Sequence, residues 1–402
     1  MKKEVCVGLV GSGYAAYLHG NGYEKVCRVN VRLKTVVDLD LEKAKAVQKR
    51  YSFEQAISSF DDLLADPEID VVDIVTPPFL HPSMAAKAMA AGKHVICEKP
   101  LTGYFGEPGD QEPIGLHVPK RKMYERCLAQ MDELKRAVDA SNRKFFYAEN
   151  FVYATPVVRA AKIIRDRRSK ILFLKGEESL KGSSSPVAGQ WKYTGGGSLV
   201  RLGSHPMGGI LWLKQQEAAA RGETITITCV SADMGKATAC LREYEHRHIA
   251  ANPQDVEDFA NLTVTFSDGT KAVIMCSDVV LGGTKNYVEI YCNDGAYHCN
   301  ITPTDLLSTY FLDEEGMEDE PISEMLPQKL GWNKVFVNDE IVRGYTGELQ
   351  DFMDTIANDG TPNSSIDLAY QTTQVMYAAY VAAEEGRTFQ FDRCSDALNG
   401  ER

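Results

Sequence analysis

The first 150 residues alternate short apolar runs with longer segments of helical spacing. The apolar runs have the length of strands and cover residues 5–10, 33–37, 71–75, 95–97 and 144–148. Helical spacing and good helix formers occupy residues 41–51, 60–65 and 82–91. This alternation is typical of a parallel sheet with helices on both faces. Residues 1–151 are therefore predicted to form an α/β domain with a doubly wound parallel sheet.

The pattern changes near residue 152, where longer β-prone runs begin. These runs cover residues 170–174, 224–231, 259–266, 270–277 and 288–292. Ser267, Asp268 and Gly269 separate two of them and predict the turn of a hairpin. Three further segments have helical spacing, at residues 156–165, 348–357 and 366–384. Residues 152–402 are therefore predicted to be a second, α+β domain with a mostly antiparallel or mixed sheet.

Two segments carry neither pattern. Residues 102–121 are rich in glycine and proline, which predicts a long loop inserted in the first domain. Long loops in compact domains are usually functional or disordered. Residues 314–330 are rich in glutamate and include two prolines, which predicts a solvated surface loop.

The composition is that of an ordinary globular protein. Hydrophobic residues make up 44% and charged residues 25% of the 402 residues. Single cores stop growing near ~250–300 residues, so this length agrees with two domains. The net charge of −12 argues against nucleic acid or an anionic membrane as the main partner.

Several features predict a cytoplasmic location. The ten cysteines include no C-x-x-C pair, and several lie in strand-like runs where a reduced thiol behaves as a small hydrophobe. The apolar stretch after Met1-Lys2-Lys3 is only as long as a strand and leads into a glycine turn without a cleavage site. No apolar run approaches the ~18 residues of a membrane span. Disulfides, a signal peptide and a membrane anchor are therefore not expected.

A glycine-rich turn follows the first predicted strand and fits G-x-G-x-x-A. It comprises Gly11, Ser12, Gly13, Tyr14, Ala15 and Ala16. The two glycines permit a tight turn and close approach of a pyrophosphate, and the following helix start supplies N–H groups. Asp38 ends the second strand, where a carboxylate accepts hydrogen bonds from ribose hydroxyls and repels a 2′-phosphate. NAD is therefore predicted rather than NADP; a purely structural turn is the alternative.

A second segment is expected beside the cofactor. Thr76 and Pro77 directly follow the strand at 71–75, and His81 comes four residues later. Ligands of open α/β sheets bind beyond the carboxyl ends of the strands. These residues are therefore predicted to border NAD, although His81 could equally be the first residue of a helix.

Several segments together resemble the Gfo/Idh/MocA oxidoreductases, named for glucose–fructose oxidoreductase and inositol dehydrogenase. They include the glycine turn, Asp38, Thr-Pro-Pro-x-x-His at 76–81, Ala-Gly-Lys-His-Val-Ile-Cys-Glu-Lys-Pro-Leu at 91–101, Gly-Gly-Gly-Ser-Leu at 195–199, His205, Val-Glu-Asp-Phe at 256–259 and the terminal Gly-Arg at 386–387. The resemblance implies a Rossmann domain and an open, predominantly antiparallel sheet domain that often forms homo-oligomers, here a dimer or tetramer. It also implies oxidation or reduction of one secondary carbon of a sugar or cyclitol.

The resemblance assigns catalytic roles to Lys99 and His205. Lys99 would donate to the substrate hydroxyl oxygen and stabilise alkoxide character as hydride leaves the carbon. His205 would take the hydroxyl proton. Glu98 would orient Lys99 beside the cofactor. The alternatives are a surface Lys99 paired with Glu98 and a structural His205.

This chain departs from the family pattern at Arg201, where an aspartate is usual. A guanidinium suits a carboxylate, sulfonate or phosphate, so the substrate is expected to be anionic. Lys120 and Arg121, in the long loop, would favour the same ligands. The alternative is an Arg201 paired with a neighbouring acid such as Glu149 or Glu178.

Other candidate contacts carry weaker signals. Glu149, Asn150 and Tyr153 lie at the end of the first domain and could contact nicotinamide or sugar hydroxyls. Trp191 could form a platform for a sugar face or pack at a domain interface. His246 and His248 have a spacing that can bind a metal, but a charged, solvated loop is the preferred interpretation, and no metal is expected.

Three functions remain open at this point. The first is NAD-dependent oxidation or reduction of a secondary hydroxyl on a sugar, glycoside or cyclitol. Because some relatives use the hydride step only transiently, the second is a glycosidase that oxidises C3, eliminates the C1 group, adds water and returns the hydride, acting on an anionic glycoside such as a sulfoquinovoside or glucuronide. The third is a non-catalytic, dinucleotide-binding regulator.

Overall fold

The structure is a computed structural model that describes residues 3–302, 307–312, 330–335 and 339–391. Most of the predicted loop at 314–330 and Cys394 lie outside these residues. The chain forms two compact units. Unit 1 comprises Met1–Tyr104, Lys122–Tyr153 and Gly344–Gln374, and unit 2 comprises Phe105–Arg121, Ala154–Arg343 and Val375–Arg402. A single boundary between residues 151 and 152 does not represent these exchanged segments.

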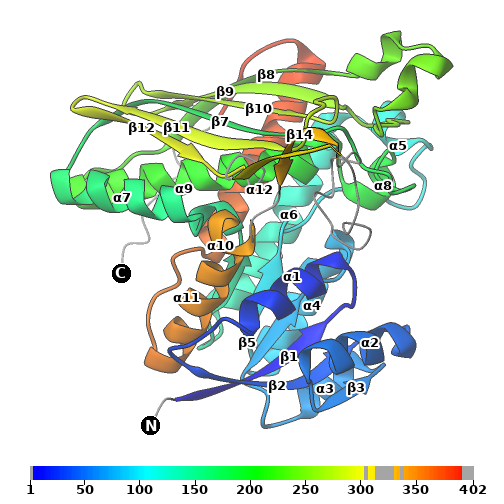
Figure 1. Cartoon of the computed structure of the whole chain (residues 1–402), viewed down its shortest axis with the longest axis vertical. Coiled ribbons are helices and arrows are strands. Elements are labelled where there is room, and N and C mark those ends of the chain that lie inside the picture. The colour runs from blue at the N-terminus through cyan, green and yellow to red at the C-terminus, as the bar shows by residue number, and fades with distance from the viewer. Residues whose placement is uncertain (1–2, 303–306, 313–329, 336–338, 392–402) are drawn as a thin grey trace. The chain divides into compact units, whose positions relative to one another are not determined.

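Unit 1 contains a six-stranded sheet in which every neighbouring pair of strands is parallel. Its order is β3 (Gln55–Ile57), β2 (Asn30–Val37), β1 (Glu4–Val10), β4 (Val71–Ile74), β5 (His94–Glu98) and β6 (Phe145–Ala148) (Figure 1). This is the Rossmann strand order. The predicted doubly wound sheet is confirmed, and only the short β3 was not expected.

Unit 1 contains helices that the sequence predicted and others that it did not. They are α1 (Tyr14–Tyr23), α2 (Leu41–Tyr51), α3 (Phe60–Ala65), α4 (His81–Ala90), most of α6 (Lys120–Asp139) and α11 (Tyr345–Asn358), with the short η1 (Pro78–Leu80) and η2 (Asn150–Val152). Asp40 caps α2 by accepting from the backbone N–H groups of Glu42 and Lys43. The predicted limits of α2 and α3 agree with the structure.

Unit 2 contains a seven-stranded sheet. Its order is β12 (Gly295–Asn300), β11 (Lys285–Cys292), β7 (Ile171–Ser179), β10 (Lys271–Ser277), β9 (Phe259–Phe266), β8 (Ile227–Gly235) and β15 (Phe389–Gln390). The β7–β10 pair is parallel and the other pairs are antiparallel. The predicted hairpin at residues 267–269 joins β9 to β10, with Gly269 at φ +83°.

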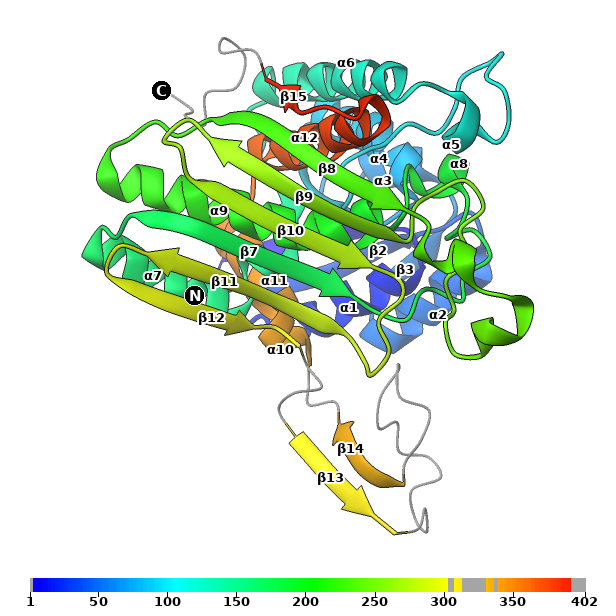
Figure 2. The same cartoon turned by 90° about the horizontal axis from the view of Figure 1, so that it is seen from above.

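Helices cover one face of this sheet. The long helices α7 (Thr155–Arg167) and α9 (Ser204–Arg221) lie beneath the strands in Figure 1, and Figure 2 looks onto the opposite face. Gly176 of β7 permits this packing, because a Cβ there would lie 2.8 Å from the Pro206 Cβ of α9. The remaining short elements are α5 (Ile114–His117), α8 (Trp191–Thr194), η3 (Leu199–Gly203), η4 (Ala237–Cys240), η5 (Glu243–Arg247), α10 (Asp339–Arg343), β13 (Leu307–Phe311) and β14 (Gly331–Val335). The second half of α12 (Ile366–Glu385) also belongs to unit 2.

Two predictions about segments were wrong. Residues 102–121 are not a single loop, because α5 lies within them and α6 begins at Lys120, directly after Pro119. α11 was expected in the second domain but packs in unit 1, where Gly22 of α1 lies against Leu349. A local sequence pattern shows that a segment is helical, but it does not show against which sheet the helix packs.

Two further observations concern the whole chain. The described helices include none with the length and apolarity that a bilayer crossing requires. The cysteines within the described residues form no disulfide.

Candidate active site

The glycine turn has the geometry that a pyrophosphate requires. Gly11 has φ +105°, and a Cβ there would lie 2.8 Å from the Val75 carbonyl oxygen, so only glycine fits. Gly13 is the N-cap of α1, has open space where a Cβ would lie and offers no side-chain cap. The start of α1 therefore carries no side-chain cap and leaves space beside Gly13, as a helix start that binds an anion does.

Asp38 and Ser12 complete the dinucleotide end of unit 1. The Ser12 backbone N–H donates to Asp38 Oδ2 at 2.8 Å, and the Asp40 N–H donates to Asp38 Oδ1 at 2.9 Å. These bonds fix the Asp38 carboxylate just beyond β2, at the position where the sequence predicts a group that binds the ribose hydroxyls. The buried Ser12 Oγ has no hydrogen-bond partner among the described residues. Tyr14 is exposed, and Ala15 packs against the cluster that contains Leu9.

His81 links the turns that follow two neighbouring strands. It is the first residue of α4 and is buried, with Nε2 2.8 Å from the Thr76 carbonyl oxygen and Nδ1 2.9 Å from the Pro100 carbonyl oxygen. Burial lowers its pKa, against the effect of the two carbonyls. The ring therefore holds Thr76 and Pro77 on one side and the Glu-Lys-Pro turn on the other.

A buried histidine between two carboxylates supports Lys99. His19 of α1 has Nδ1 2.8 Å from Asp73 Oδ2 and Nε2 3.3 Å from Glu98 Oε1. Glu98 Oε2 accepts the backbone N–H of Lys99 at 2.8 Å. Burial alone would lower the pKa of His19, but the carboxylates, Asp73 above all, raise it well above its usual value. His19 thus fixes Glu98, and Glu98 fixes the backbone of the half-buried Lys99.

The residues at the end of β6 are buried in unit 1. Glu149 Oε1 accepts the Phe151 N–H at 3.3 Å, and Asn150 begins η2. The Tyr153 hydroxyl donates to Asp351 at 3.0 Å and its ring packs edge-on against Phe352. Tyr153 therefore has a structural role in unit 1, in addition to any contact with a ligand.

In unit 2, one glutamate holds the triple-glycine turn. Glu257 Oε2 accepts the Gly197 N–H at 3.1 Å and Oε1 accepts the Leu199 N–H at 2.8 Å, while the Tyr380 hydroxyl donates to Oε1 at 2.9 Å. A Cβ at Gly197 would lie 1.9 Å from the Glu257 carbonyl oxygen. The turn and Glu257 are therefore fitted to one another.

This turn leads directly to Arg201 and His205. Arg201 lies in η3, a π-helical turn that continues into α9, and His205 is the second residue of α9. π-Helical turns often occur at functional sites. His205 is buried, and the four-residue spacing places it on the same side of the helical run as Arg201. The segment from Leu199 to His205 therefore forms a continuous helical run that begins α9.

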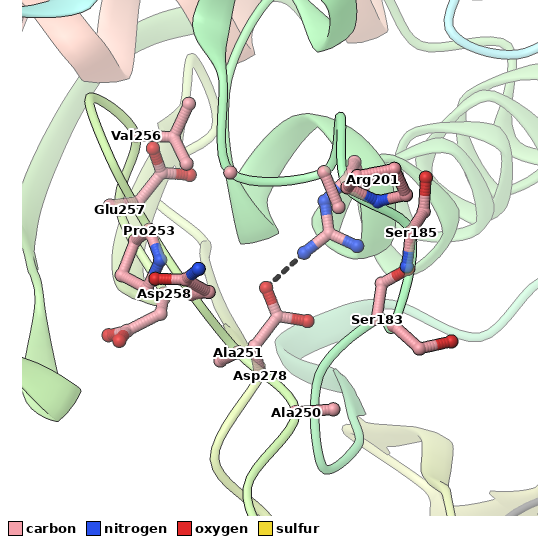
Figure 3. Close-up of a pocket in the computed structure, with 15 residues that line it drawn as sticks. Ser183, Ser185, Arg201, Ala250, Ala251, Pro253, Val256, Glu257, Asp258 and Asp278 are labelled. Atoms are coloured by element: carbon pink, nitrogen blue, oxygen red, sulfur yellow. Dashed lines mark hydrogen bonds and ion pairs between the residues drawn. The ribbon is translucent and has the colours of Figure 1, made fainter. Parts of the chain in front are cut away.

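Arg201 is paired with an acid. Its Nη2 donates to Oδ2 of Asp278, the residue directly after β10 (Figure 3). The alternative that the sequence left open, an Arg201–carboxylate pair, is therefore present, with Asp278 as an acid that was not considered. Both residues line a cavity of about 180 Å³ in unit 2 that also reaches Ser183–Ser185, Glu257 and Asp258.

The other predicted cations and aromatics of unit 2 pack together. Lys120 Nζ lies 4.8 Å from the centre of the Trp191 ring and donates to the Gly115 carbonyl at 2.7 Å. Arg121 pairs with Glu385 at 2.8 Å. The buried Trp191 ring packs 4.7 Å from that of Tyr380. These residues are held by groups of unit 2, and the role of Trp191 toward a sugar stays a prediction.

Models of one family match both parts of the chain. The model of an oxidoreductase family with an NAD-binding Rossmann fold matches residues 5–107, and that of the GFO/IDH/MocA C-terminal domain matches residues 174–298. The chain belongs to the Gfo/Idh/MocA oxidoreductases. It is thus an NAD-dependent oxidoreductase, and the glycine turn, Ser12 and Asp38 provide the fit that NAD requires.

Relatives and solved structures agree with this family. An uncharacterized oxidoreductase of Synechocystis sp. is 25% identical over 336 residues, which cover 83% of this chain and 81% of the relative. Levoglucosan dehydrogenase of Pseudarthrobacter phenanthrenivorans is 25% identical over 324 residues, 77% of each chain. The structure of GenD2 from gentamicin A biosynthesis in complex with NAD has a TM-score of 0.75 at 22% identity and covers 98% of this chain and 97% of that chain. This last likeness shows the fold.

The sequence analysis did not identify four residues that take part in the candidate site. His19 lies in α1, the helix expected after the glycine turn, and Asp73 lies inside a strand that was read only as an apolar run. Glu257 was part of the family resemblance but carried no assigned role. Asp278 directly follows a predicted strand, and that position at a strand end was the only signal available for it.

Glu257 gives the oxidoreductase a pH dependence that can be measured. Burial raises its pKa to about 7, against the three hydrogen bonds that it accepts. The folded protein then keeps a proton that the unfolded chain has lost, so stability falls as pH rises from about 4.5 to about 7, by roughly 3 kcal/mol for this group. We expect Glu257→Gln to unfold in urea with a shallower decrease of stability between pH 5 and 8 than the wild type. An unchanged slope would contradict this assignment; Glu243→Gln, at an exposed site, is the matched control.

Proposed function

We propose that this protein catalyses NAD-dependent oxidation and reduction of a secondary hydroxyl on a sugar, glycoside or cyclitol, with Lys99 and His205 as the catalytic residues. The observation that carries this proposal is the fixed position of Lys99. It follows β5, at the carboxyl edge of the NAD-binding sheet, and the His19–Glu98 contact holds its backbone. His205, at the rigid start of α9, is the proposed partner from unit 2.

The two side chains have complementary tasks. Lys99 donates to the hydroxyl oxygen and stabilises the negative charge that develops on it. His205 accepts the proton of that hydroxyl during oxidation and returns it during reduction. Bound NAD would supply the acceptor, and NADH the donor, for the hydride of the carbinol carbon. Gly11, Gly13 and Asp38 would hold the pyrophosphate and the ribose, while Thr76 and Pro77 would border the nicotinamide end.

The named relatives support a polyhydroxylated ring as substrate. Levoglucosan dehydrogenase and the inositol 2-dehydrogenase of Arthrobacter sp., which is 25% identical over 313 residues, both carry names of such activities. The three cations that favoured an anionic substrate are engaged within unit 2. Arg201 pairs with Asp278, Lys120 lies near Glu384, and Arg121 pairs with Glu385. The support for an anionic substrate is correspondingly reduced.

The redox-neutral glycosidase and the non-catalytic regulator remain testable alternatives. The glycosidase uses the same hydride step, so the catalytic residues do not separate it from the dehydrogenase. The proposed homo-oligomer, dimer or tetramer, and the cytoplasmic location also remain predictions. Sedimentation of the purified protein and fractionation of cells test them directly.

A substrate screen tests the proposed function. The purified protein with NAD is incubated with neutral and acidic pyranosides, aryl glycosides and cyclitols, and both NADH absorbance and released aglycone are followed. We expect NADH to accumulate with at least one neutral polyol. Aglycone release without net NADH would replace the dehydrogenase by the glycosidase. Tight NAD binding without either product would favour the regulator.

A further inference from the structure

Asp278 is a buried carboxylate with one oxygen that forms no hydrogen bond to any group of the described residues. The residue is 3% exposed and lines the unit 2 cavity. Its Oδ2 accepts from Arg201, whereas Oδ1 has no hydrogen-bond partner among the described residues. Figure 3 shows the second oxygen directed away from Arg201, toward the side of the cavity where Ser183 and Ser185 lie. A buried carboxylate oxygen of this kind requires a hydrogen-bond donor.

The two other acids that line the cavity have their carboxylates occupied. Asp258 accepts the N–H groups of Ala237 at 2.6 Å and Thr238 at 3.0 Å. Glu257 accepts from the triple-glycine turn, as described above. Among the acids of this lining, Asp278 therefore supplies a carboxylate oxygen, Oδ1, that lacks a donor within the described residues. The lining holds one guanidinium and the carboxylates of Asp258 and Asp278, so it carries no excess of positive charge that would attract an anionic ligand.

We propose that Asp278 is the residue that accepts a hydroxyl of the substrate, and that Arg201 positions it. This inference rests on the proposed function and names its substrate class, a neutral polyol. The family pattern has an aspartate where this chain has Arg201, and here a carboxylate reaches the cavity from β10 instead. Arg201 thus holds an acid rather than an anionic ligand. Hydroxyl groups donate to Oδ1, whereas the carboxylate of a uronic acid would be repelled by it.

The arrangement also explains why the pair is rigid. Arg201 lies in a π-helical turn fixed by Glu257, and Asp278 follows a strand in the middle of the sheet. The backbone N–H of Asp278 donates to the Asp258 carbonyl oxygen at 2.8 Å. A hydroxyl-binding group held on such elements discriminates ligands better than one on a loop.

The test measures binding separately from turnover. Full-length protein loaded with NAD is titrated with myo-inositol, methyl α-glucopyranoside and the matched glucuronide by calorimetry and ligand-observed NMR. We expect a neutral polyol to bind, the glucuronide to bind at least about tenfold more weakly, and Asp278→Asn to weaken the neutral ligand by about tenfold or more, because a charged acceptor is lost. The KM for that polyol should rise with little change in kcat.

Matched variants keep the result interpretable. Arg201→Met with Asp278→Leu replaces the buried pair by apolar groups of similar size, which a fold often tolerates, and it should abolish polyol binding with the melting temperature retained. Asp294→Asn removes a carboxylate that pairs with Arg167 at 2.9 Å outside the cavity, and it should bind as the wild type does. Equal polyol affinity in wild type and Asp278→Asn, tighter glucuronide binding, or no polyol binding at all overturns the inference. Binding without NADH formation would instead refute only the proposed function.

Discussion

Lys99→Ala is expected to reduce NADH formation by about 10²- to 10⁴-fold, the range in which a positioned proton-transfer or charge-stabilising group contributes. The loss should appear in kcat, because the lysine acts on the charge that develops on the substrate oxygen. NAD should still bind, with an affinity within about tenfold of the wild type, since Gly11, Gly13 and Asp38 hold the other end of the dinucleotide. Steady-state kinetics and NAD calorimetry measure the two effects separately.

A matched control tests whether the loss is specific to Lys99, and a double variant tests whether Lys99 and His205 act together. Lys87→Ala removes an exposed lysine of α4 that pairs with Asp61, and activity should not change. If Lys99 and His205 act as one unit, the double alanine variant should lose little more than the more severe single variant. Independent, multiplying losses would show that they act at different steps. Full turnover in Lys99→Ala would remove the lysine from the mechanism.

Gly197→Ala is expected to destabilise unit 2 strongly. Its Cβ would lie 1.9 Å from the Glu257 carbonyl oxygen, a backbone atom that cannot rotate away. The turn must then move, and the hydrogen bonds that Gly197 and Leu199 donate to Glu257 are lost. Overpacking combined with broken buried hydrogen bonds costs about 3 kcal/mol or more. Urea unfolding and the melting temperature measure the loss.

The cause of that loss can be tested as well. Glu257→Ala in the Gly197→Ala background should not restore stability, because the obstructing atom belongs to the backbone. Gly235→Ala is the matched control, since nothing lies within 4 Å of the position that a Cβ would take there, and its effect should be small. A Gly197→Ala protein with wild-type stability would mean that the turn tolerates displacement, and the fixed start of α9 would then lose its support.

The sequence predicted the central strands of both sheets, but it did not predict the strands β3, β12 and β15 or some of the helices. Buried strands such as β1 and β5 are continuous apolar runs, which local pattern detects. α9 was missed because Pro206, Gly208 and Gly209 lie in its first turns and predict a loop, whereas its nearly complete burial stabilises it as a helix. Tertiary packing determined the structure of this segment.

The site shows the same limit. The glycine turn and the Glu-Lys-Pro turn are contiguous motifs, so the sequence alone is enough to find them and to place them after their strands. The partners of those residues come from distant segments: His19 is 79 residues from Glu98, and Arg201 is 77 residues from Asp278. Which of many acids approaches a given cation depends on the pairing of strands and helices, and no local pattern encodes it.

The return of α11 to unit 1 has a consequence for biosynthesis. During translation, the Rossmann sheet emerges complete by residue 153, yet the helix that covers α1 arrives only after Gly344. At ribosomal rates of about 5–20 residues per second, this face of α1 stays uncovered for roughly 10 to 40 seconds before α11 has been synthesised. A nascent chain in that interval presents uncovered apolar surface, which is a target for chaperones. Expression of residues 1–151 alone would make this transient exposure permanent and yield aggregated protein.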